Sequence, residues 1–307
     1  MNGDVVILLS AYNGKNYITQ QLDSIAGQTY PGKIITLVRD DGSSDETARL
    51  VQDYPQDPQR QLQLLAEENV GPQRSFLELL RQAPLADYYF FADQDDVWDS
   101  DKVEAAVTQM GQSDDPVCWC SNFRLTHTDM TVYKEAALSE SPVFTPLRTL
   151  FYNKIPGCVM GFNRPLLELL RQLRLKDVMM HDSMTLCLAA ACGRILYDPQ
   201  PRISHRIHGS NVVGDGHKKI LLHKWIPEKL KLLFGKEKYD LSEMARQFLN
   251  IAGDRMSPEY REDLELLRNF KKSRKLTGQL LKHPDTQGKR FDRTVMSIRC
   301  KIFFHIF

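Results

Sequence analysis

The first hundred residues alternate between short apolar runs and amphipathic stretches, and this rhythm limits the fold more than any other feature. Strands are predicted at the apolar runs, which are residues 5–9, 34–38, 62–65 and 88–92. Helices are predicted between them, at residues 17–26, 43–54 and 71–83. Strands that alternate with helices form a mostly parallel sheet with helices on both faces. The sequence therefore predicts an α/β fold.

The rest of the chain divides into two parts. Up to about residue 216 it mixes predicted strands, at residues 117–124, 158–162 and 195–197, with predicted helices at residues 163–173 and 183–192. The strand at 195–197 is expected to stop at Asp198-Pro199, because proline disrupts a strand ladder. From His217 onward the pattern is that of amphipathic helices rich in Lys and Arg. We expect a first domain at residues 1–216 and a basic helical extension at 217–307.

Composition excludes several classes of protein. With 42% hydrophobic residues among 307, the chain can bury a sizeable core, and its net charge of +1 gives no sign of a nucleic-acid partner. No apolar run reaches the roughly 20 residues of a membrane span, and the first residues lack the features of a signal peptide. The six cysteines show no CxxC spacing, so they are predicted to be reduced core thiols in a cytoplasmic protein.

Four polar residues, Asp93-Gln94-Asp95-Asp96, follow the apolar run at 88–92. Carboxylates at the end of a buried strand need a counter-charge, because burying an uncompensated charge is costly. A divalent metal is the usual one, and it often joins a carboxylate to substrate phosphates. If the strand continues to Asp95, then Asp93 and Asp95 share a face and Asp96 points elsewhere. The alternative is a solvated acidic turn.

A second acidic turn, Asp40-Asp41-Gly42, ends the second predicted strand. Gly42 permits a sharp turn with positive φ. An ionised aspartate only accepts hydrogen bonds, which suits the N–H of a nucleobase or a ribose hydroxyl. The alternative is a capped turn, because Ser43 and Glu46 have the spacing of a capping box that begins the next helix.

Two later polar segments also carry candidates. His181-Asp182 precedes a predicted helix, where Asp182 is either an N-cap or a general base. His205, Arg206 and His208 lie in a segment predicted to be strand and loop. They are either ordinary polar residues, or His208 reaches a metal or diphosphate while Arg206 adds positive charge.

Taken together, these segments resemble the family 2 glycosyltransferases, which have the nucleotide-sugar-binding GT-A fold. The matching segments occur in order along about 215 residues: Ser10-Ala11-Tyr12-Asn13-Gly14, Asp40-Asp41-Gly42-Ser43-Ser44-Asp45, the DxD element at Asp93 and Asp95, Gly157-Cys158-x-Met160-x-Phe162-Asn163, His181-Asp182, and His208-Gly209-Ser210-Asn211-Val212-Val213-Gly214. The form of the Asp93 segment and of the His208 loop is most similar to the bacterial rhamnosyltransferase branch, which builds O-antigens, capsules and cell-wall rhamnans.

The resemblance implies roles for individual residues. The catalytic base would be Asp182, and the metal, Mg²⁺ or Mn²⁺, would be held by Asp95 and His208. The residues that the resemblance places around the nucleotide-sugar are Ala11, Tyr12, Asp40, Asp41, Asp93, Gln94 and Arg206. Those on the acceptor side are Trp98, Gly157 and His181. Ser183 and Met184 stand where related sequences often have aromatic residues, so the identity of the acceptor does not follow from the resemblance.

The implied function is inverting transfer of a hexose, such as rhamnose from dTDP-rhamnose, to a hydroxyl of a growing bacterial surface glycan. The donor would be linked to dTDP or UDP, and the acceptor would be a glycan, most naturally a lipid-linked one. The basic extension suggests a peripheral contact with the cytoplasmic face of the inner membrane through Trp225, Leu232, Leu233 and Phe234. A homodimer contact through Phe303, Phe304 and Phe307 is a further expectation.

Two other functions fit parts of the sequence. Asp93-x-Asp95-x-Val97 after an apolar strand matches the nucleophile motif of haloacid-dehalogenase-like phosphatases, in which Asp93 would form an aspartyl-phosphate. That motif normally opens the domain, whereas here it follows the fourth predicted strand. The chain could also be a non-catalytic nucleotide-sugar-binding subunit of a polysaccharide assembly, but such a subunit is expected to have lost a metal or base carboxylate.

Overall fold

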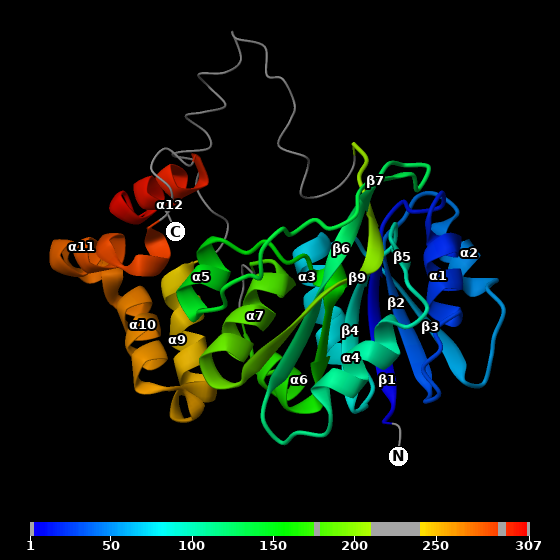
Figure 1. Cartoon of the computed structure of the whole chain (residues 1–307), viewed down its shortest axis with the longest axis horizontal. Helices are drawn as coiled ribbons and strands as arrows, with labels where there is room; N and C mark the ends of the chain where they lie inside the picture. Colours follow the sequence, from blue (N-terminus) through cyan, green and yellow to red (C-terminus); the bar gives the residue numbers. More distant parts are fainter. Residues whose placement is uncertain (1–2, 175–178, 210–239, 288–292, 306–307) are drawn as a thin grey trace, which may run out of the picture.

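A computed structural model describes residues 3–174, 179–209, 240–287 and 293–305 of the chain (Figure 1). In these residues nine strands form one sheet in the order β3-β2-β1-β4-β8-β6-β9-β5, with β7 paired to β6. The strands are β1 (Val5–Ala11), β2 (Ile34–Asp41), β3 (Arg60–Glu67), β4 (Tyr88–Asp93), β5 (Val97–Trp98), β6 (Val117–Thr126), β7 (Val132–Lys134), β8 (Met160–Asn163) and β9 (Arg194–Arg206). The α/β expectation is confirmed.

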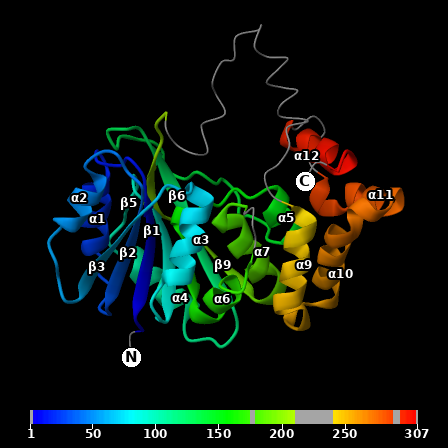
Figure 2. The same cartoon turned by 180° about the vertical axis from the view of Figure 1, so that it is seen from behind.

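The first four strands run parallel and form one half of the sheet. Helices α1 (Ile18–Ala26) and α2 (Thr47–Gln52) lead from β1 outward to β3, and α3 (Pro72–Gln82) leads back to β4. Because such crossovers are right-handed, α3 lies on the face opposite α1 and α2 (Figures 1 and 2). The order in which the chain adds strands to the sheet reverses between β1 and β4. In open α/β sheets, ligands bind outside the carboxyl ends of the strands at that point.

The second half of the sheet is mixed. β8 pairs antiparallel with both β4 and β6, while β9 pairs parallel with β6. The prediction that the 195–197 strand stops at Asp198-Pro199 is wrong, because β9 continues to Arg206. A register shift accommodates the proline, since Ser121 pairs with Asp198 and Asn122 already pairs with Pro201. Prolines are tolerated at such irregularities, and the continuation carries His205 and Arg206 to the end of β4.

The start of α2 also differs from the expectation. The helix begins at Thr47, and Ser43 does not cap it. Instead, the Ser43 hydroxyl hydrogen-bonds the carboxylate of Asp40, and the cap amide of Thr47 donates to Asp45 at 2.9 Å. The capping-box prediction is therefore wrong, because a carboxylate from the preceding strand competes for the Ser43 hydroxyl.

Some of the remaining helices cover the sheet, and the others extend the molecule at one end. Their bounds are α4 (Lys102–Met110), α5 (Pro146–Phe151), α6 (Arg164–Leu170), α7 (His181–Cys192), α9 (Leu241–Ala252), α10 (Pro258–Asn269), α11 (Arg274–Lys282) and α12 (Arg293–Phe303), with short 3₁₀ turns η1 (Gly157–Val159), η3 (Gly253–Arg255), η4 (Phe270–Lys272) and η5 (Pro284–Thr286). Helices α9 to α12 stand together at the end of the molecule opposite β3 (Figure 1).

The C-terminal helices share the hydrophobic core of the sheet. In α9, Leu241, Met244 and Phe248 are buried in one continuous cluster with β1 and α7. Helix α9 packs on α7 and α10, and α10 packs on α5. The predicted boundary near residue 217 lies outside the described residues, as do Trp225, Leu232, Leu233, Phe234 and Phe307.

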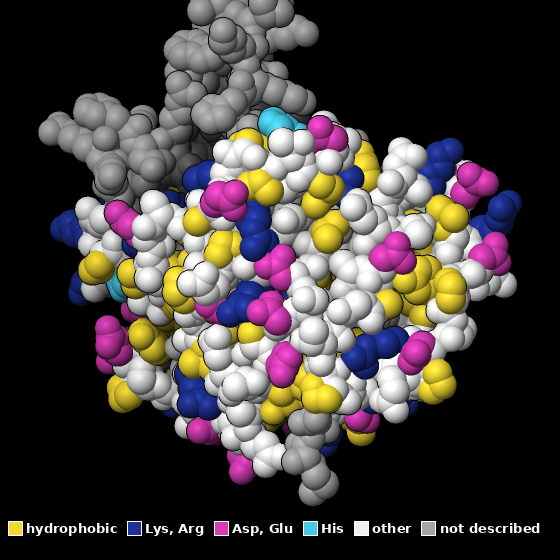
Figure 3. All heavy atoms as spheres, turned by 45° about the vertical axis from the view of Figure 1, so that its right-hand side comes forward, with side chains coloured by type: hydrophobic (Ala, Val, Ile, Leu, Met, Phe, Trp, Pro, Cys, Tyr) yellow, Lys and Arg dark blue, Asp and Glu magenta, His cyan; other side chains and the backbone are white. Residues whose placement is uncertain are grey.

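The surface carries both signs of charge. On the face shown in Figure 3, Lys and Arg side chains are interspersed with Asp and Glu, and neither sign covers a continuous area. Phe303 and Phe304 are 62% and 55% exposed. Among the described residues, no helix has both the length and the apolar character needed to cross a bilayer.

Candidate active site

The tips of β1 and β4 are joined by one side chain. The Gln94 amide accepts a hydrogen bond from the Tyr12 backbone N–H at 2.8 Å and donates to the Tyr12 carbonyl at 3.0 Å. A Cβ atom at Gly14 would lie 2.0 Å from Gln94 Oε1, so this close approach requires glycine. Ala11 is buried, whereas the Tyr12 side chain is 49% exposed beside this junction. The two loops at the point where the strand order reverses are therefore held together.

The two carboxylates at the end of β2 have different partners. Asp40 accepts hydrogen bonds from the backbone N–H of Ser43, at 3.0 Å, and from its hydroxyl. Asp41 pairs with the buried Arg39 and accepts from the N–H groups of Val70 and Gly71 at 3.0 and 2.9 Å. Asp41 therefore fixes the loop before α3, and Asp40 shapes the turn between β2 and α2. Arg39, which the sequence reasoning missed, gave no signal beyond its place inside an apolar strand.

Three carboxyl groups gather after β4. Burial, followed by the negative charges of Asp96 and Asp95, raises the pKa of Asp93 to about 7. Burial and Asp96 also raise the pKa of Asp95. The expectation that Asp96 points away is wrong, because β4 ends at Asp93 and the residue-by-residue alternation stops there. Asp96 is instead fully buried inside the cluster.

Asp96 forms a buried ion pair with His205. The Asp96 Oδ1 atom lies 2.8 Å from His205 Nδ1 and also accepts the Arg206 backbone N–H at 3.2 Å. Burial alone would lower the pKa of His205, but the attraction of Asp96 outweighs it and raises the pKa to about 9. The same pairing lowers the pKa of Asp96 despite its burial. His205 thus supplies a buried positive charge that balances Asp96 within the acidic cluster.

A second buried cation lies close to this pair. The Lys102 side chain at the start of α4 is fully buried; its Nζ donates to the Cys158 carbonyl at 2.6 Å and sits 3.3 Å from the centre of the Trp98 ring. Burial lowers the pKa of Lys102 to about 7, against the attraction of nearby groups that include Asp96 and Asp93. The sequence reasoning missed Lys102, because nothing in its local pattern marks it as buried. It named His205 as a candidate polar residue but did not predict the ion pair with Asp96.

His208 and Arg206 arrive from the end of β9. His208 Nε2 lies 2.6 Å from Asp95 Oδ2, and the imidazole stacks on Tyr17 at 5.1 Å between ring centres. The Arg206 guanidinium donates to the Asp95 carbonyl at 2.9 Å and to the Thr128 carbonyl at 2.8 Å. Asp95 and His208, the predicted metal ligands, therefore lie in contact. Arg206 links the backbone of the Asp95 segment to that of Thr128.

The donor set suits a hard divalent cation. Asp93 and Asp95 are desolvated carboxylates whose pKa values are raised by burial and by the negative charge of Asp96. Asp96 Oδ2 is a buried oxygen without a hydrogen-bond partner among the described residues. Carboxylate oxygens with one imidazole are ligands that Mg²⁺ or Mn²⁺ accepts. Cys158, Asp96 and His205 also place their ligand atoms within 4.8 Å of one another, but a thiol is a poor ligand for these ions.

Asp182 lies in the first turn of α7, which begins at His181, so it is not the N-cap. Its carboxylate accepts the Ser183 backbone N–H. Burial raises the pKa of Asp182 to about 6, although hydrogen bonds from Ser183 and Asn153 oppose the rise. A carboxylate with this pKa is a stronger proton acceptor than an exposed aspartate and is still ionised at neutral pH.

The other three acceptor-side candidates are buried beside Asp182 and the acidic cluster. The His181 ring stacks on Phe76 at 3.7 Å and meets Phe91 edge-on at 4.4 Å between ring centres. A Cβ atom at Gly157 would lie 2.0 Å from His181 Nε2. Trp98 is 3% exposed. Because Phe91 lies two residues before Asp93, the His181 contact sets the start of α7 beside the end of β4.

Comparison with known proteins adds independent information. A family model described as "Glycosyl transferase family 2" matches residues 6–170. The "dTDP-rhamnosyl transferase RfbG" of Shigella flexneri is 24% identical over 217 residues, covering 67% of this chain and 73% of that protein. The "Putative teichuronic acid biosynthesis glycosyltransferase TuaG" of Bacillus subtilis is 32% identical over 106 residues, covering 34% of this chain and 41% of that protein.

Solved structures with a similar fold also exist. A crystal structure of S. aureus TarS, residues 1–349, superposes with a TM-score of 0.56 at 16% identity, covering 99% of this chain and 80% of that one. The same fragment in complex with UDP-GlcNAc gives a TM-score of 0.53 at 17% identity, covering 92% and 77%. At these identities the likeness concerns the fold.

Proposed function

Because this chain belongs to the family 2 glycosyltransferases and has the GT-A fold, we propose that it is an inverting, metal-dependent hexosyltransferase. Its donor is a hexose linked to dTDP or UDP. Its acceptor is a hydroxyl of a growing, lipid-linked bacterial surface glycan. Asp182 is the base, and the acidic cluster at the end of β4 would hold the divalent cation that assists departure of the diphosphate.

The observation that carries the proposal is the under-compensated acidic cluster at the reversal point between β1 and β4. Asp93 has a pKa of about 7, and Asp95 is buried against His208 at 2.6 Å. Carboxylates held there at a cost in desolvation are best explained by a bound cation. The neighbouring turn at Asp40 and the exposed Tyr12 offer a hydrogen-bond acceptor and an aromatic face to a nucleobase.

The residues of the chain divide the chemistry between them. The acceptor oxygen forms a bond to the anomeric carbon from the face opposite the diphosphate, whose bond to that carbon breaks at the same time. Asp182 takes the proton of the acceptor hydroxyl. Asp95 and His208 would hold a divalent cation, which would supply positive charge to the departing diphosphate. Gln94 and Arg206 hold the β1 and β4 loops in place.

Rhamnose is the first donor sugar to test, since the name of the Shigella relative specifies a dTDP-rhamnosyl transferase. A bacterial envelope glycan is the proposed acceptor class, since the name of the Bacillus relative refers to teichuronic acid biosynthesis. Basic residues after His217 fit a peripheral contact with anionic lipid on the cytoplasmic face of the inner membrane, and the exposed Phe303 and Phe304 fit a homodimer contact.

The test is a donor screen on the full-length chain. The protein is incubated with dTDP-rhamnose, dTDP-glucose, UDP-glucose or UDP-GlcNAc and Mg²⁺ or Mn²⁺, and released nucleoside diphosphate is measured. We expect release from one class of donor, and chelation with EDTA should abolish it. Undiminished turnover after thorough chelation would contradict the metal role of Asp95 and His208.

Two outcomes would favour the rival functions. Hydrolysis of p-nitrophenyl phosphate without any nucleotide requirement would indicate a phosphatase with Asp93 as nucleophile. Binding of a nucleotide-sugar with neither hydrolysis nor transfer to any acceptor would indicate a non-catalytic subunit. The intact carboxylates at Asp95 and Asp182 argue against that second outcome.

A further inference from the structure

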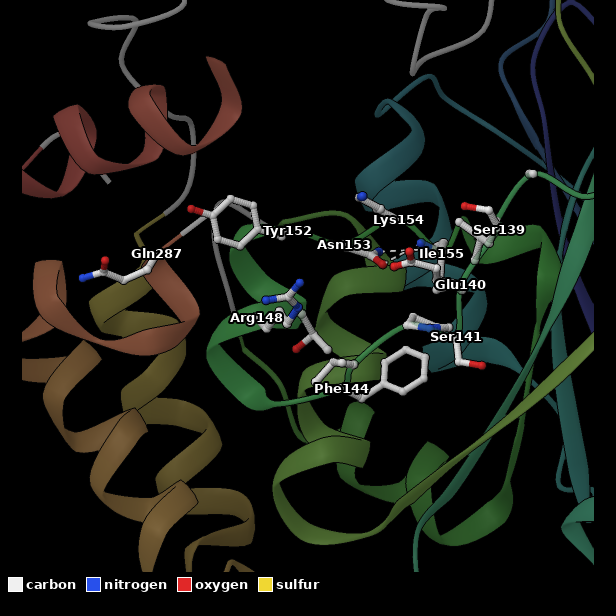
Figure 4. Close-up of a pocket in the computed structure, with 15 residues that line it drawn as sticks. Ser139, Glu140, Ser141, Phe144, Arg148, Tyr152, Asn153, Lys154, Ile155 and Gln287 are labelled. Atoms are coloured by element: carbon white, nitrogen blue, oxygen red, sulfur yellow. Dashed lines mark hydrogen bonds between the residues drawn. The ribbon is translucent and has the colours of Figure 1, made fainter. Parts of the chain in front are cut away.

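A pocket of about 570 Å³ opens between the loop after β7, helix α5 and the turn that follows η5 (Figure 4). The β7–α5 loop supplies Glu140 and Phe144, α5 supplies Arg148, and the segment after α5 supplies Asn153 and Lys154. Gln287 closes the side nearest the C-terminal helices (Figure 4). The pocket thus lies at the junction of the sheet domain and the helical extension.

One wall of the pocket touches the candidate base. Asn153 lines the pocket, and its amide donates to Ser183 Oγ at 3.3 Å and hydrogen-bonds the Asp182 carboxylate. The same amide group is fixed by two bonds with Ile155, at 2.8 and 2.9 Å, which Figure 4 draws as dashed lines. Asn153 therefore contacts both the pocket and the carboxylate of Asp182.

The C-terminal helices take part in building the pocket. The Tyr152 hydroxyl donates to the Thr286 carbonyl at 3.3 Å. Thr145, which caps α5, hydrogen-bonds the carboxylate of Asp285. Both contacts join α5 to η5, across about 140 residues of sequence. The position of Arg148 on α5 is consequently set by the extension as well as by the sheet domain.

The pocket carries positive charge that no described residue neutralises by pairing. Neither the half-buried Arg148 guanidinium nor the exposed Lys154 ammonium forms an ion pair with a described residue. Glu140 is the one acidic residue among the lining residues, and it is exposed. Phe144 and Tyr152 add half-buried aromatic surface, which suits the apolar face of a sugar ring.

We propose that this pocket is the acceptor subsite and that it selects a glycan bearing an anionic group, a carboxylate or a phosphate. Arg148 and Lys154 bind the anion, and the reacting hydroxyl reaches Asp182 past Asn153. The inference rests on the proposed transferase function and names its acceptor class. It also gives the C-terminal helices a role in acceptor recognition.

The experiment compares three soluble probes on the full-length protein. Octyl β-D-glucoside is neutral, octyl β-D-glucuronide carries a carboxylate, and octyl β-D-glucoside 6-phosphate carries a phosphate. Dissociation constants are measured by calorimetry. We expect at least one anionic probe to bind about ten-fold or more tightly than the neutral one, since charge-assisted hydrogen bonds are the strong ones. The dissociation constants of the two anionic probes show whether the pocket prefers a carboxylate or a phosphate.

Variants connect the preference to the pocket. Arg148→Met and Lys154→Met should each remove most of the anionic preference, while Arg49→Met on α2, whose side chain is 71% exposed, should keep it. A thermal scan checks that each variant is folded. If Arg148→Met is not folded, Lys154→Met alone tests the inference, because Lys154 is exposed. Equal binding of all three probes, or an anionic preference unchanged in both pocket variants, would overturn the inference. Donor turnover in the same preparation reports separately on the proposed function.

Discussion

At the scale of single residues, burial changes what a carboxyl group can do. Asp182 and Asp93 have the same side chain, yet burial raises the pKa of the first to about 6 and that of the second, aided by two neighbouring acids, to about 7. Asp96 lies in the same cluster, and His205 lowers its pKa. The three environments leave Asp182 a stronger proton acceptor than an exposed aspartate, leave Asp93 partly protonated near neutral pH, and keep Asp96 ionised.

Replacing Asp182 with Asn should abolish proton acceptance and leave the donor site intact. We expect kcat to fall by about 10² to 10⁴-fold, the usual contribution of a general base, with donor affinity unchanged. In the wild type, Asp182 is protonated below its pKa of about 6 and ionised above it. Transfer should therefore decline about ten-fold per pH unit below 6, as measured by initial rates at saturating metal.

Asp23→Asn is a matched control, because Asp23 lies on α1 and hydrogen-bonds Tyr54 at 2.7 Å, away from the site. Its pH profile should match that of the wild type. An Asp182→Asn variant that transferred sugar at a near wild-type rate would remove Asp182 as the base.

His205→Gln should destabilise the fold by leaving Asp96 buried without its counter-charge. The pKa of His205 is about 9 in the folded protein, against about 6.5 when unfolded, so the pairing contributes about 3 kcal/mol. Because the folded pKa is raised, this contribution is complete below pH 6.5 and is lost as pH rises through about 9. Urea unfolding of the wild type at pH 6.5 and pH 9.5 should show the loss.

The double variant His205→Gln/Asp96→Asn tests the cause. Removing both charges should recover part of the lost stability, because the uncompensated buried charge is the main cost of the single change. If the single variant were as stable as the wild type at pH 6.5, the ion pair would have no structural role.

At the scale of elements, the start of α7 is placed by the close contact between Gly157 and the His181 ring. Gly157→Ala should push the His181 ring away, since the added Cβ would lie 2.0 Å from its Nε2 atom. Asp182 follows His181 directly, so we expect transfer to fall by at least ten-fold while donor binding persists. The measurement is acceptor-dependent turnover beside donor affinity.

Gly278→Ala in α11 is the control for this change, because a Cβ atom there meets nothing within 4 Å. Alanine in a helix should raise stability by about 0.4–1 kcal/mol and leave turnover unaltered. Wild-type turnover in Gly157→Ala would show that the start of α7 tolerates displacement.

The elements also show which local signals fail. The capping box at Ser43 and Glu46 did not start α2, because the Ser43 hydroxyl binds Asp40 instead. Asp198-Pro199 did not end β9, because the register shift against β6 absorbs the proline. In the first case a carboxylate three residues away competed for the capping side chain, and in the second the neighbouring strand β6 supplied the pairing.

At the scale of the whole molecule, the C-terminal helices complete the core that begins at β1. Phe248→Ala on α9 removes a fully buried ring and should cost about 3–5 kcal/mol, measured by thermal or urea unfolding. Phe303→Ala, at a side chain 62% exposed, should change stability by less than about 0.5 kcal/mol. Equal stability of the two variants would mean that α9 is not part of the folding unit.

The same packing bears on the expected division at residue 217. A chain of residues 1–216 would expose the surface of α7 on which α9 packs, and it would lack Gln287 from the pocket. The described helices on either side of residue 217 share one core, and the two-part division itself stays a prediction.

The sequence by itself determined the alternation of strands and helices, the position of the acidic cluster at a strand end, and the ordered family motifs. These features are local, because periodicity and turn chemistry depend on residues a few positions apart. Only the tertiary structure decided which distant polar and charged groups meet. His205 and Asp96 are 109 residues apart, Lys102 and Cys158 are 56 apart, and Thr145 and Asp285 are 140 apart. Such contacts depend on strand order and helix packing, so the paired charges beneath the site and the basic pocket beside Asp182 emerge only in the folded chain.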